Sequence, residues 1–371
     1  MKEGWTYKKL GEVCNIDFGT RVVRSRDAGS KYPVYGGGGA TFKMDTYNRE
    51  DCMVISRFGM SEECTRFVKG KFFLNDSGLT LSMKTSCMIQ TFLDWQIHSL
   101  NNTIYSLGRG AAQKNLDTKA LAEIKITYPN NKEEQQRIVS RLDSAFAHID
   151  ERKANAEKQL SEARALFQKA LTKAMEPKEG WEEKTIGELT DSCLGKMLDK
   201  HKNKGELKPY LRNLNVRWDG FDLDDILEMR FEEGEEDRYG IKEGDLIICE
   251  GGEPGRCAIW SNQIANMKIQ KALHRVRSKG EIENRFLLFS IMLYSKNGFL
   301  DNYESGATIK HLTGEALKRI PISFPPLSEQ QRIVSRLDSL FAHVRELEEV
   351  LQKTIAECDA LKQALLRKVF E

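Results

Sequence analysis

Hydrophobic positions recur every seven residues in two long stretches of the chain. In the first stretch, which begins at Glu133, the repeated positions are Leu142, Ile149, Ala156, Ala163 and Ala170. In the second they are Leu337, Val344, Leu351, Cys358 and Leu365. Apolar residues spaced three and four apart over five heptads, without Gly or Pro, are typical of a coiled-coil helix. We therefore predict two long helices that pair antiparallel, over residues 131–176 and 328–371.

The ends of both helices carry recognisable signals. Asn131-x-x-Glu134 and Ser328-x-x-Gln331 match the capping-box pattern, and Pro177 stops the first helix. At 1.5 Å per residue, each helix of about 44 residues spans roughly 65 Å. Charged residues interrupt the apolar seam at three positions and are expected to set the pairing register: Lys153, Glu348 and Lys362.

The chain also repeats itself. The 15 residues from Glu134 to His148 return 195 positions later, from Glu329 to His343, with one difference. Gly4-Trp5 recurs 176 positions later, and the segment Gly-Ala-x-x-Lys-x-Leu occurs before each helix. We predict two tandem copies of one unit, with globular domains at 1–130 and 177–327 and helical segments at 131–176 and 328–371. Segments that are identical in both copies are expected to meet the same partner or each other, and segments that differ are expected to recognise different things.

Short strands and helices are predicted inside the globular domains. Runs rich in β-branched and aromatic residues predict strands, and two apolar segments of helical character predict helices. The predicted strands are 52–59, 71–74, 79–83, 245–249 and 257–260, and the predicted helices are 92–100 and 283–294. The expected fold class is therefore α+β, with two mixed domains and a pair of long antiparallel helices.

Charge is distributed unevenly along the chain, although the net charge is only +2. The first domain carries 18 Lys and Arg against 13 Asp and Glu. The second carries 23 against 26, but ten of those acids lie between Asp219 and Asp237. Lys and Arg mixed with Asn, Gln and aromatic residues suit contacts with phosphates and base edges.

Several kinds of chemistry find no support in the sequence. The eight cysteines form no CxxC pair, so we expect buried free thiols and no metal site. There is no phosphate-binding loop, and the run Tyr35 to Gly39 is interpreted as a flexible turn that lets the backbone approach a ligand. His148 and His343 are expected to pack at the helix interface. Because these catalytic and cofactor motifs are missing, we expect a non-catalytic chain. No apolar run approaches a membrane span or a signal peptide, which predicts a cytoplasmic location.

These motifs together resemble the specificity subunits of type I restriction-modification systems. Both copies of Glu-Gln-x-x-Ile-Val-x-x-Leu open a long helix after a variable domain; the second follows Pro325, where the first copy has Asn130. Gly-Trp-x-x-x-x-(Leu/Ile)-Gly-Glu begins each domain, at Gly4 and Gly180. The resemblance covers the whole chain.

The resemblance implies a DNA-reading subunit without a catalytic site or a bound cofactor of its own. Each domain would read one half of a split, asymmetric sequence in double-stranded DNA, while the helices set the gap. Two modification subunits would dock on the repeated helices, bring S-adenosylmethionine and methylate adenine. Endonuclease subunits that use ATP and Mg²⁺ would complete the complex.

Candidate contact residues follow from side-chain chemistry. Arg and Lys suit guanine, and Asn and Gln suit adenine. For DNA contact we predict Lys43, Arg57, Arg109, Gln113 and Lys114 in the first domain, and Arg212, Asn213, Asn215, Arg256 and Lys310 in the second. For helix pairing and partner docking we predict Gln135, Ile138, Leu142 and Phe146, with their repeats Gln330, Ile333, Leu337 and Phe341.

Three other hypotheses remain at this stage. A stand-alone two-headed DNA-binding protein would lack methyltransferase partners. A self-contained DNA enzyme would transfer methyl groups or cleave DNA alone. A coiled-coil scaffold for proteins only would show no salt-dependent affinity for DNA.

Overall fold

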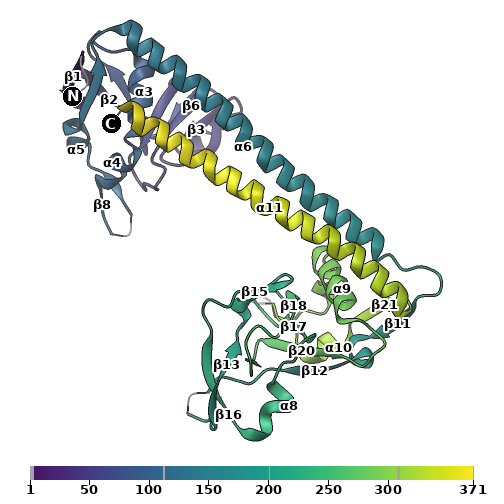
Figure 1. Cartoon of the computed structure of the whole chain (residues 1–371). Helices are drawn as coiled ribbons and strands as arrows, with labels where there is room; N and C mark the ends of the chain where they lie inside the picture. The colour runs from purple at the N-terminus through teal and green to yellow at the C-terminus, as the bar shows by residue number, and fades with distance from the viewer. Residues whose placement is uncertain (1–3, 112, 200, 307–309, 371) are drawn as a thin grey trace. The chain divides into compact units, whose positions relative to one another are not determined.

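The computed structural model describes residues 4–111, 113–199, 201–306 and 310–370. It divides the chain into two compact units, one comprising Met1–Lys158 with Leu351–Glu371 and the other Gln159–Val350. The two long helices are α6 (Lys132–Ala174) and α11 (Leu327–Phe370), and each unit holds part of both. The predicted α+β class is confirmed: each unit joins a mixed domain to two segments of long helix (Figure 1).

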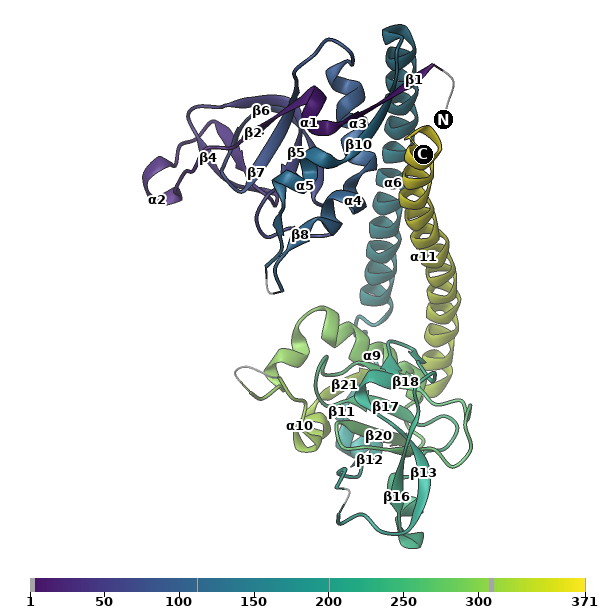
Figure 2. The same ribbon diagram turned by 90° about the vertical axis from the view of Figure 1, so that its left-hand side faces the viewer.

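The domain of the first unit is built on a six-stranded sheet with the order β2-β7-β5-β6-β3-β4. Its strands are β2 (Cys14–Phe18), β3 (Tyr32–Tyr35), β4 (Ala40–Met44), β5 (Arg49–Ser56), β6 (Thr65–Leu74) and β7 (Gly78–Met83). Helix α3 (Gln90–Ser99) packs against β5 and β6 (Figure 2). The last four residues of β5 are all buried, as expected for a central strand covered on both faces.

A second small layer closes this domain. Strand β1 (Trp5–Lys9) pairs antiparallel with β10 (Lys125–Pro129), next to helices α1 (Leu10–Val13) and α5 (Thr118–Glu123). The remaining elements are α2 (Arg24–Asp27), α4 (Asn101–Ser106) and the hairpin β8 (Gly108–Arg109) with β9 (Asn115–Leu116). A Cβ atom at Gly11 would lie 3.0 Å from the Ala122 Cβ, and one at Gly187 would lie 3.1 Å from the Lys318 Cβ. The repeated glycine is therefore explained by a close helix contact that both domains share.

The second unit uses the same strand connections although its sequence differs. Its four-stranded sheet has the order β12-β20-β17-β18, all antiparallel, which matches β2-β7-β5-β6 in the first unit. These strands are β12 (Thr190–Leu194), β17 (Leu246–Cys249), β18 (Cys257–Ile259) and β20 (Leu273–Ser278). The outer pair is β11 (Glu182–Thr185) with β21 (Pro321–Phe324), next to α7 (Ile186–Leu189) and α10 (Gly314–Arg319). The other elements are β13 (Glu206–Leu211), β14 (Val216–Arg217), β15 (Gly220–Phe221), β16 (Leu227–Phe231), β19 (Lys268–Ile269), α8 (Glu236–Tyr239) and α9 (Asn284–Lys296).

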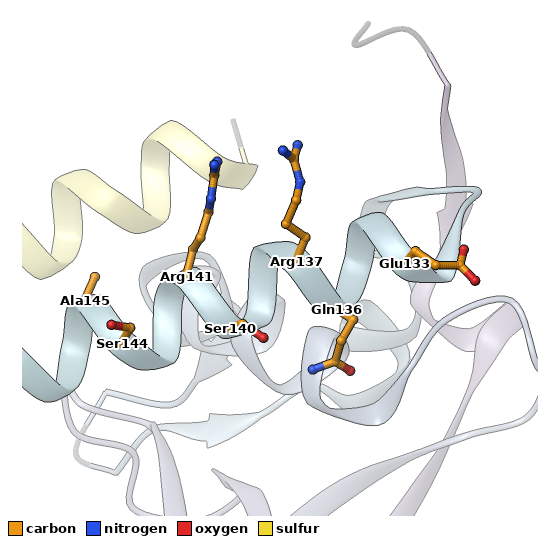
Figure 3. A pocket seen from close by; sticks show the side chains of 7 residues that line it. All are labelled: Glu133, Gln136, Arg137, Ser140, Arg141, Ser144 and Ala145. Carbon is orange, nitrogen blue, oxygen red and sulfur yellow. The ribbon is translucent and has the colours of Figure 1, made fainter.

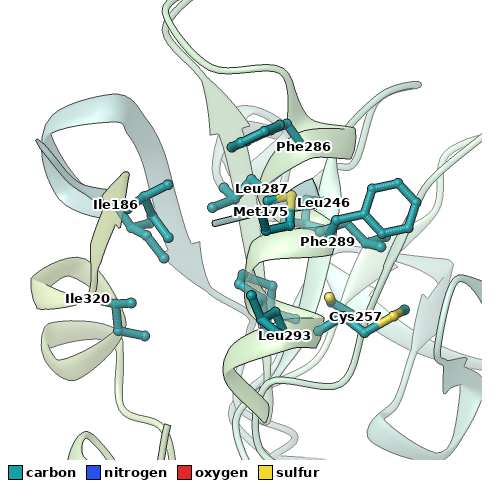
Figure 4. Close-up of a cluster of buried hydrophobic side chains, with 14 of the residues drawn as sticks. Met175, Ile186, Leu246, Cys257, Phe286, Leu287, Phe289, Leu293 and Ile320 are labelled. Carbon is teal, nitrogen blue, oxygen red and sulfur yellow. The ribbon is translucent and has the colours of Figure 1, made fainter. Parts of the chain in front are cut away.

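The largest hydrophobic core lies in the second unit. Helix α9 contributes Phe286, Leu287 and Phe289, which are fully buried against strand residues such as Leu246 (Figure 4). The end of α6 and the start of α11 belong to the same core, through Leu171 among others. Packing of α9 against both long helices therefore anchors them to this domain.

The repeated tryptophan has the same packing role in both units. The Trp5 ring lies 6.2 Å from that of Phe92 on α3, and the Trp181 ring lies 6.0 Å from that of Phe286 on α9, at interplanar angles of 59° and 62°. Tilted aromatic pairs at this separation are favourable. The repeated tryptophan thus makes the same packing contact in both units, with α3 in the first and with α9 in the second.

The long helices pair antiparallel within each unit, as predicted. In the first unit Lys153 bonds to Asp359 at 2.7 Å, and Lys362 pairs with Asp150. In the second unit Arg164 bonds to Glu348 at 2.7 Å, while the rings of Phe167 and Phe341 lie 4.8 Å apart. All three charges predicted to interrupt the seam therefore meet an opposite charge on the other helix.

Two helix predictions are wrong. Helix α11 begins at Leu327, so Ser328 lies in its first turn and does not cap it; the Pro326 carbonyl accepts the first backbone bonds instead. His148 and His343 are exposed and do not pack at the helix interface. Each histidine lies one residue before a buried position of the seven-residue repeat, Ile149 or Val344, and so faces away from the seam.

Candidate nucleic-acid interface

Four of the predicted contact residues in the first domain gather at one place. Arg57 follows β5 directly, and the β8–β9 hairpin carries Arg109, Gln113 and Lys114. The Leu116 N–H donates to the Arg57 carbonyl at 2.8 Å, so the hairpin is held against the end of β5. Arg109 and Gln113 are exposed and Lys114 is half-buried. We call this group, residues 57–60 with 109–111 and 113–115, the first-domain edge.

Arg57 lies against two aromatic rings. Its guanidinium carbon lies 4.7 Å from the Phe18 ring centroid and 4.4 Å from that of Phe58. Both rings are unusually exposed, at 47% and 37%. Cation–π contacts hold the guanidinium plane while leaving N–H donors at its rim. The sequence prediction included Arg57 but missed both phenylalanines, because a single exposed aromatic residue has no periodic pattern.

The other cations of this edge differ in their partners. The Lys114 ammonium lies 3.9 Å from the Tyr105 ring centroid, whereas Arg109 forms an ion pair with Asp117. Lys43 does not join the group: it lies in β4, at the far end of the sheet order from β2. The first-domain edge is therefore basic and aromatic, which is the composition that suits phosphates and bases.

The glycine-rich turn is only partly free, which corrects its interpretation as a flexible loop. A Cβ atom at Gly36 would lie 2.6 Å from the Asn75 Oδ1, and one at Gly37 would lie 2.7 Å from the Phe58 carbonyl oxygen. Gly38 and Gly39 meet nothing within 4 Å. Two of the four glycines are thus required by close packing inside the protein, and two face open space.

Two of the predicted residues in the second domain, Asn213 and Arg256, bond to each other, whereas a third, Arg212, pairs with a different residue. Arg256 donates through Nη2 to the Asn213 carbonyl at 3.0 Å, and the Asn213 Nδ2 donates to the Gly251 carbonyl at 2.5 Å. Arg212 forms an ion pair with Asp225 at 2.7 Å. Asn213 and Arg256 therefore lie beside the segment that follows β17, which corresponds in topology to the end of β5.

Asn215 and Lys310 are placed differently. Asn215 is fully buried, and its amide donates to the carbonyls of Asp222 and Asp225. Lys310 bonds to Asp301 at 2.6 Å and to Glu304 at 3.0 Å, and these bonds raise the pKa of its ammonium. Lys310 and Lys114 occupy equivalent sequence positions, yet only Lys310 meets carboxylates within the described part of the chain.

The acidic run of the second domain serves as a set of counterions for basic residues of the same unit. Its pairs are Asp219 with Arg285, Asp222 with Arg217, Asp225 with Arg212, Glu235 with Lys196 and Glu236 with Lys268. Lys268 is 1% exposed, so its charge needs the nearby carboxylate. The second domain consequently presents fewer uncompensated cations than the first.

The repeated glutamine has identical bonds in both units. The Gln135 side chain accepts from the Ile89 N–H at 2.8 Å and donates to the carbonyls of Cys87 and Pro129 at 3.0 and 2.8 Å. Gln330 accepts from the Glu283 N–H at 2.8 Å and donates to the carbonyls of Glu281 and Pro325 at the same two distances. Both side chains are fully buried. Each glutamine therefore fastens the start of a long helix to its own domain.

The repeated apolar residues line the helix packing. Leu142 and Phe146 are buried with Leu366 of α11, and Ile138 packs at the edge of this cluster. In the second unit the equivalent residues Ile333 and Leu337 are buried in the main core, with Phe341 packed against it. All six predicted apolar positions thus face a hydrophobic cluster.

A further set of repeated residues is exposed. On α6 a shallow hollow is lined by Glu133, Gln136, Arg137, Ser140, Arg141, Ser144 and Ala145 (Figure 3). We call the exposed residues Gln136, Arg137, Ser140, Arg141 and Ser144, with their copies Gln331, Arg332, Ser335, Arg336 and Ser339, the repeated helix face. Its ion pair is also repeated: Arg137 bonds to Glu134 at 2.7 Å, and Arg332 to Glu329 at 3.4 Å. The Arg137 bond lowers the pKa of Glu134.

Reactive groups are scarce in the part of the chain that the structure describes. No group of three or more His, Cys, Asp or Glu side chains within residues 4–370, apart from the undescribed positions, is arranged to hold a metal ion. The cysteines are free, and burial raises the pKa of the Cys14 thiol to about 12, which suppresses its nucleophilic thiolate form. None of the described helices is both long and apolar enough to cross a membrane.

Comparison with known proteins is consistent with this architecture. A family model described as "Type I restriction modification DNA specificity domain" matches residues 2–161 and 178–357. The EcoKI specificity subunit of Escherichia coli K12 is 26% identical over 72% of this chain and 62% of its own length. The EcoDI specificity subunit of Escherichia coli is 23% identical over 99% of this chain and 88% of its own length.

Solved structures share the fold. A chain from work on complex assembly and conformational transition of the type I R-M system covers 99% of this chain and 98% of its own, with a TM-score of 0.73 at 17% identity. The S subunit from M. genitalium covers 99% and 96%, with a TM-score of 0.53 at 18% identity. Because the family model matches both halves of the chain, the protein belongs to the specificity subunits of type I restriction-modification systems, with one DNA specificity domain in each half.

Proposed function

We propose that each globular domain reads one half of a split, asymmetric sequence in double-stranded DNA, and that one modification subunit docks on each copy of the repeated helix face. In this proposal the modification subunits bring S-adenosylmethionine and methylate adenine. Endonuclease subunits that use ATP and Mg²⁺ join the same complex. The chain itself determines which DNA sequence is recognised and catalyses no reaction.

The observation that carries this proposal is the identity of exposed residues between the two copies. Burial explains why Gln135 and Leu142 are repeated, since each fills a packed position. Burial does not explain why the exposed Arg141 and Ser144 are repeated as Arg336 and Ser339. Folding does not constrain these exposed residues, yet they are identical in the two copies. Binding of one copy of the same partner to each face would explain this identity.

The surfaces proposed to read DNA differ between the domains, as an asymmetric target needs. The first-domain edge presents Arg57 against two exposed rings. The corresponding segment of the second domain begins with Glu250 and two glycines, beside the bonded pair Asn213 and Arg256. Different donors and acceptors on a shared scaffold select different base edges.

The long helices are proposed to set the gap between the half-sites. Helices α6 and α11 have 43 and 44 residues. At 1.5 Å per residue this corresponds to about 65 Å, or roughly 19 base pairs at 3.4 Å each, as an upper limit for the separation of the attachment points. The gap between half-sites is expected to be smaller than this upper limit.

Methylation mapping tests this proposal directly. N6-methyladenine is mapped across the genome in cells with and without the chain, in the presence of its modification subunits. We expect methylation at one split motif only when the chain is present. Methylation that is independent of the chain, or that falls on a continuous motif, would contradict the proposal.

The docking half of the proposal has its own test. Reversing charge in both copies of the repeated helix face, with Arg141→Glu and Arg336→Glu, is expected to abolish co-purification of the modification subunits without changing the helix content. Arg152→Glu is the matched control, because Arg152 is an exposed arginine of α6 outside the repeated segment. Unchanged co-purification of the double variant would rule out this face as the docking site.

A further inference from the structure

One backbone position is built in the same way in both domains but carries opposite charges. Arg57 follows the last residue of β5, and Glu250 follows the last residue of β17. Strands β5 and β17 occupy the same place in the shared strand order. In register, Ser56 lies opposite Gly78 and Cys249 lies opposite Leu273, so the two strands also end at equivalent points.

The hydrogen bonds around this position are also the same. The Arg57 N–H donates to the Ser77 carbonyl at 2.8 Å, and the Arg57 carbonyl accepts from the Leu116 N–H at 2.8 Å. The Glu250 N–H donates to the Ala272 carbonyl at 2.9 Å, and the Glu250 carbonyl accepts from the Leu312 N–H at 2.7 Å.

One of these backbone hydrogen bonds comes from a repeated sequence segment in both domains; we call the shared set of bonds the frame. Leu116 and Leu312 are the final residues of the repeated Gly-Ala-x-x-Lys-x-Leu segment. A conserved frame around a varied side chain is the arrangement expected of a position that selects different ligands in the two domains.

A second glycine pair, which the sequence analysis missed, supports the same equivalence. Gly19 follows β2 and Gly195 follows β12, 176 positions later. A Cβ atom at Gly19 would lie 1.9 Å from the Asn75 carbonyl oxygen, and one at Gly195 would lie 2.3 Å from that of Gln270. Both glycines let the chain cross closely over the turn that precedes β7 or β20, next to Arg57 or Glu250.

The two side chains are available for a ligand. The Arg57 guanidinium makes one long hydrogen bond, at 3.5 Å to the Asp76 carbonyl. Among the described residues, no carboxylate forms an ion pair with it. Glu250 is half-buried and lines a hollow together with Lys271, His274 and Lys318. Its carboxylate likewise makes no ion pair with the described residues, so both charges remain open to polar groups from outside.

We propose that this position is a base-reading position in both domains, with Arg57 selecting guanine in the first half-site and Glu250 selecting cytosine in the second. Arg57 would donate to guanine O6 and N7, the commonest specific contact in the major groove, and Glu250 would accept from the cytosine N4 amine. The two adjacent rings fix Arg57 before it binds. Lys271 and Lys318 offset the repulsion between the Glu250 carboxylate and DNA phosphates. This inference rests on the proposed function, since it names the side chains that perform the reading.

Selection from a randomised duplex library tests the proposal. The full-length chain, assembled with its modification subunits, selects DNA as the unchanged protein and as the variants Arg57→Gln and Glu250→Gln. Each variant is expected to lose discrimination at one base pair of one half-site, by roughly 5- to 150-fold, while the other half-site is unchanged. Lys69→Gln and Glu243→Gln are the matched controls, because the exposed Lys69 lies in the middle of β6 and the exposed Glu243 precedes β17, at the opposite end of that strand from Glu250.

Two outcomes would overturn the assignment. One is an unchanged base preference at every position in both variants. The other is a uniform loss of affinity across all sequences, which marks a phosphate contact. If Arg57→Gln lowers the thermal stability of the chain, Arg57→Lys replaces it; this variant keeps the charge but loses the planar fork, and is expected to weaken the guanine preference. An unchanged protein that selects no split motif would refute the proposed function itself, whereas a split motif retained by both variants refutes only the base-reading assignment.

Discussion

Replacing the buried glutamine at the start of either long helix should destabilise the unit to which it belongs. Gln135→Ala removes three hydrogen bonds, all to backbone groups of the domain. A typical net contribution of about 1 kcal/mol per bond gives a loss of about 3 kcal/mol in the free energy of unfolding. Helix propensity opposes this effect, because alanine is the better helix former. Gln330→Ala should cost about the same in the second unit, since its three bonds have the same lengths.

The chain supplies matched controls for both variants. Gln136 and Gln331 are the next residues along the same helices and are exposed, so Gln136→Ala and Gln331→Ala should change stability by less than about 0.5 kcal/mol. Urea unfolding followed by circular dichroism measures the global effect. Hydrogen exchange of the Ile89 and Glu283 amides, which donate to the two glutamines, measures the local one. Equal stability of the Gln135→Ala and Gln136→Ala variants, with unchanged exchange at Ile89, would refute the anchoring role.

Three further predictions concern pH, the seam and helix length. Burial raises the pKa of Asp94 to about 6, and the hydrogen bond from Gln90 only partly opposes this effect. Between about pH 4 and 6 the folded chain therefore holds a proton that the unfolded chain releases. The free energy of unfolding consequently falls as the pH rises through this window. Asp94→Asn should accordingly raise the free energy of unfolding at pH 7 by about 3 kcal/mol and flatten this slope, and a variant with the same pH profile as the unchanged protein would contradict the assignment. Phe146→Ala should cost about 3 to 5 kcal/mol in a denaturant titration, since it empties a buried position next to Leu366, and a loss below about 1 kcal/mol would count against that packing. Inserting one heptad into both α6 and α11 should lengthen the methylated motif's gap by about 3 base pairs or abolish methylation, so an intact gap would disprove the spacing role.

The sequence predicted the elements of the fold well where periodicity was strong. The long helices follow from a seven-residue apolar pattern, and the central strands follow from buried runs such as Ile247–Cys249. The helix start at Leu327 was missed because backbone bonds to Pro326 begin the helix there without a side-chain cap. The shared order of the two sheets was not predictable from residues 13–109 and 189–305, since topology is preserved by backbone pairing while the side chains differ.

The candidate site was predicted less completely. Chemistry alone selected Arg57, Arg212 and Arg256, but it could not separate exposed from buried polar residues, as Asn215 shows. Glu250 was overlooked because a carboxylate does not suggest DNA binding until its position is compared with that of Arg57. The division of the repeated residues into packed and exposed ones also required the structure, because only burial distinguishes Gln135 from Gln136.

Exchange of one domain shows whether the two domains read their half-sites independently. Residues 1–130 are replaced with the corresponding domain of another specificity subunit, and the methylated motif is mapped in cells that supply the modification subunits. We expect one half of the motif to change, while the other half and the gap between them stay the same. A change in both halves, or in neither, would contradict independent reading by two unlike domains on one repeated frame.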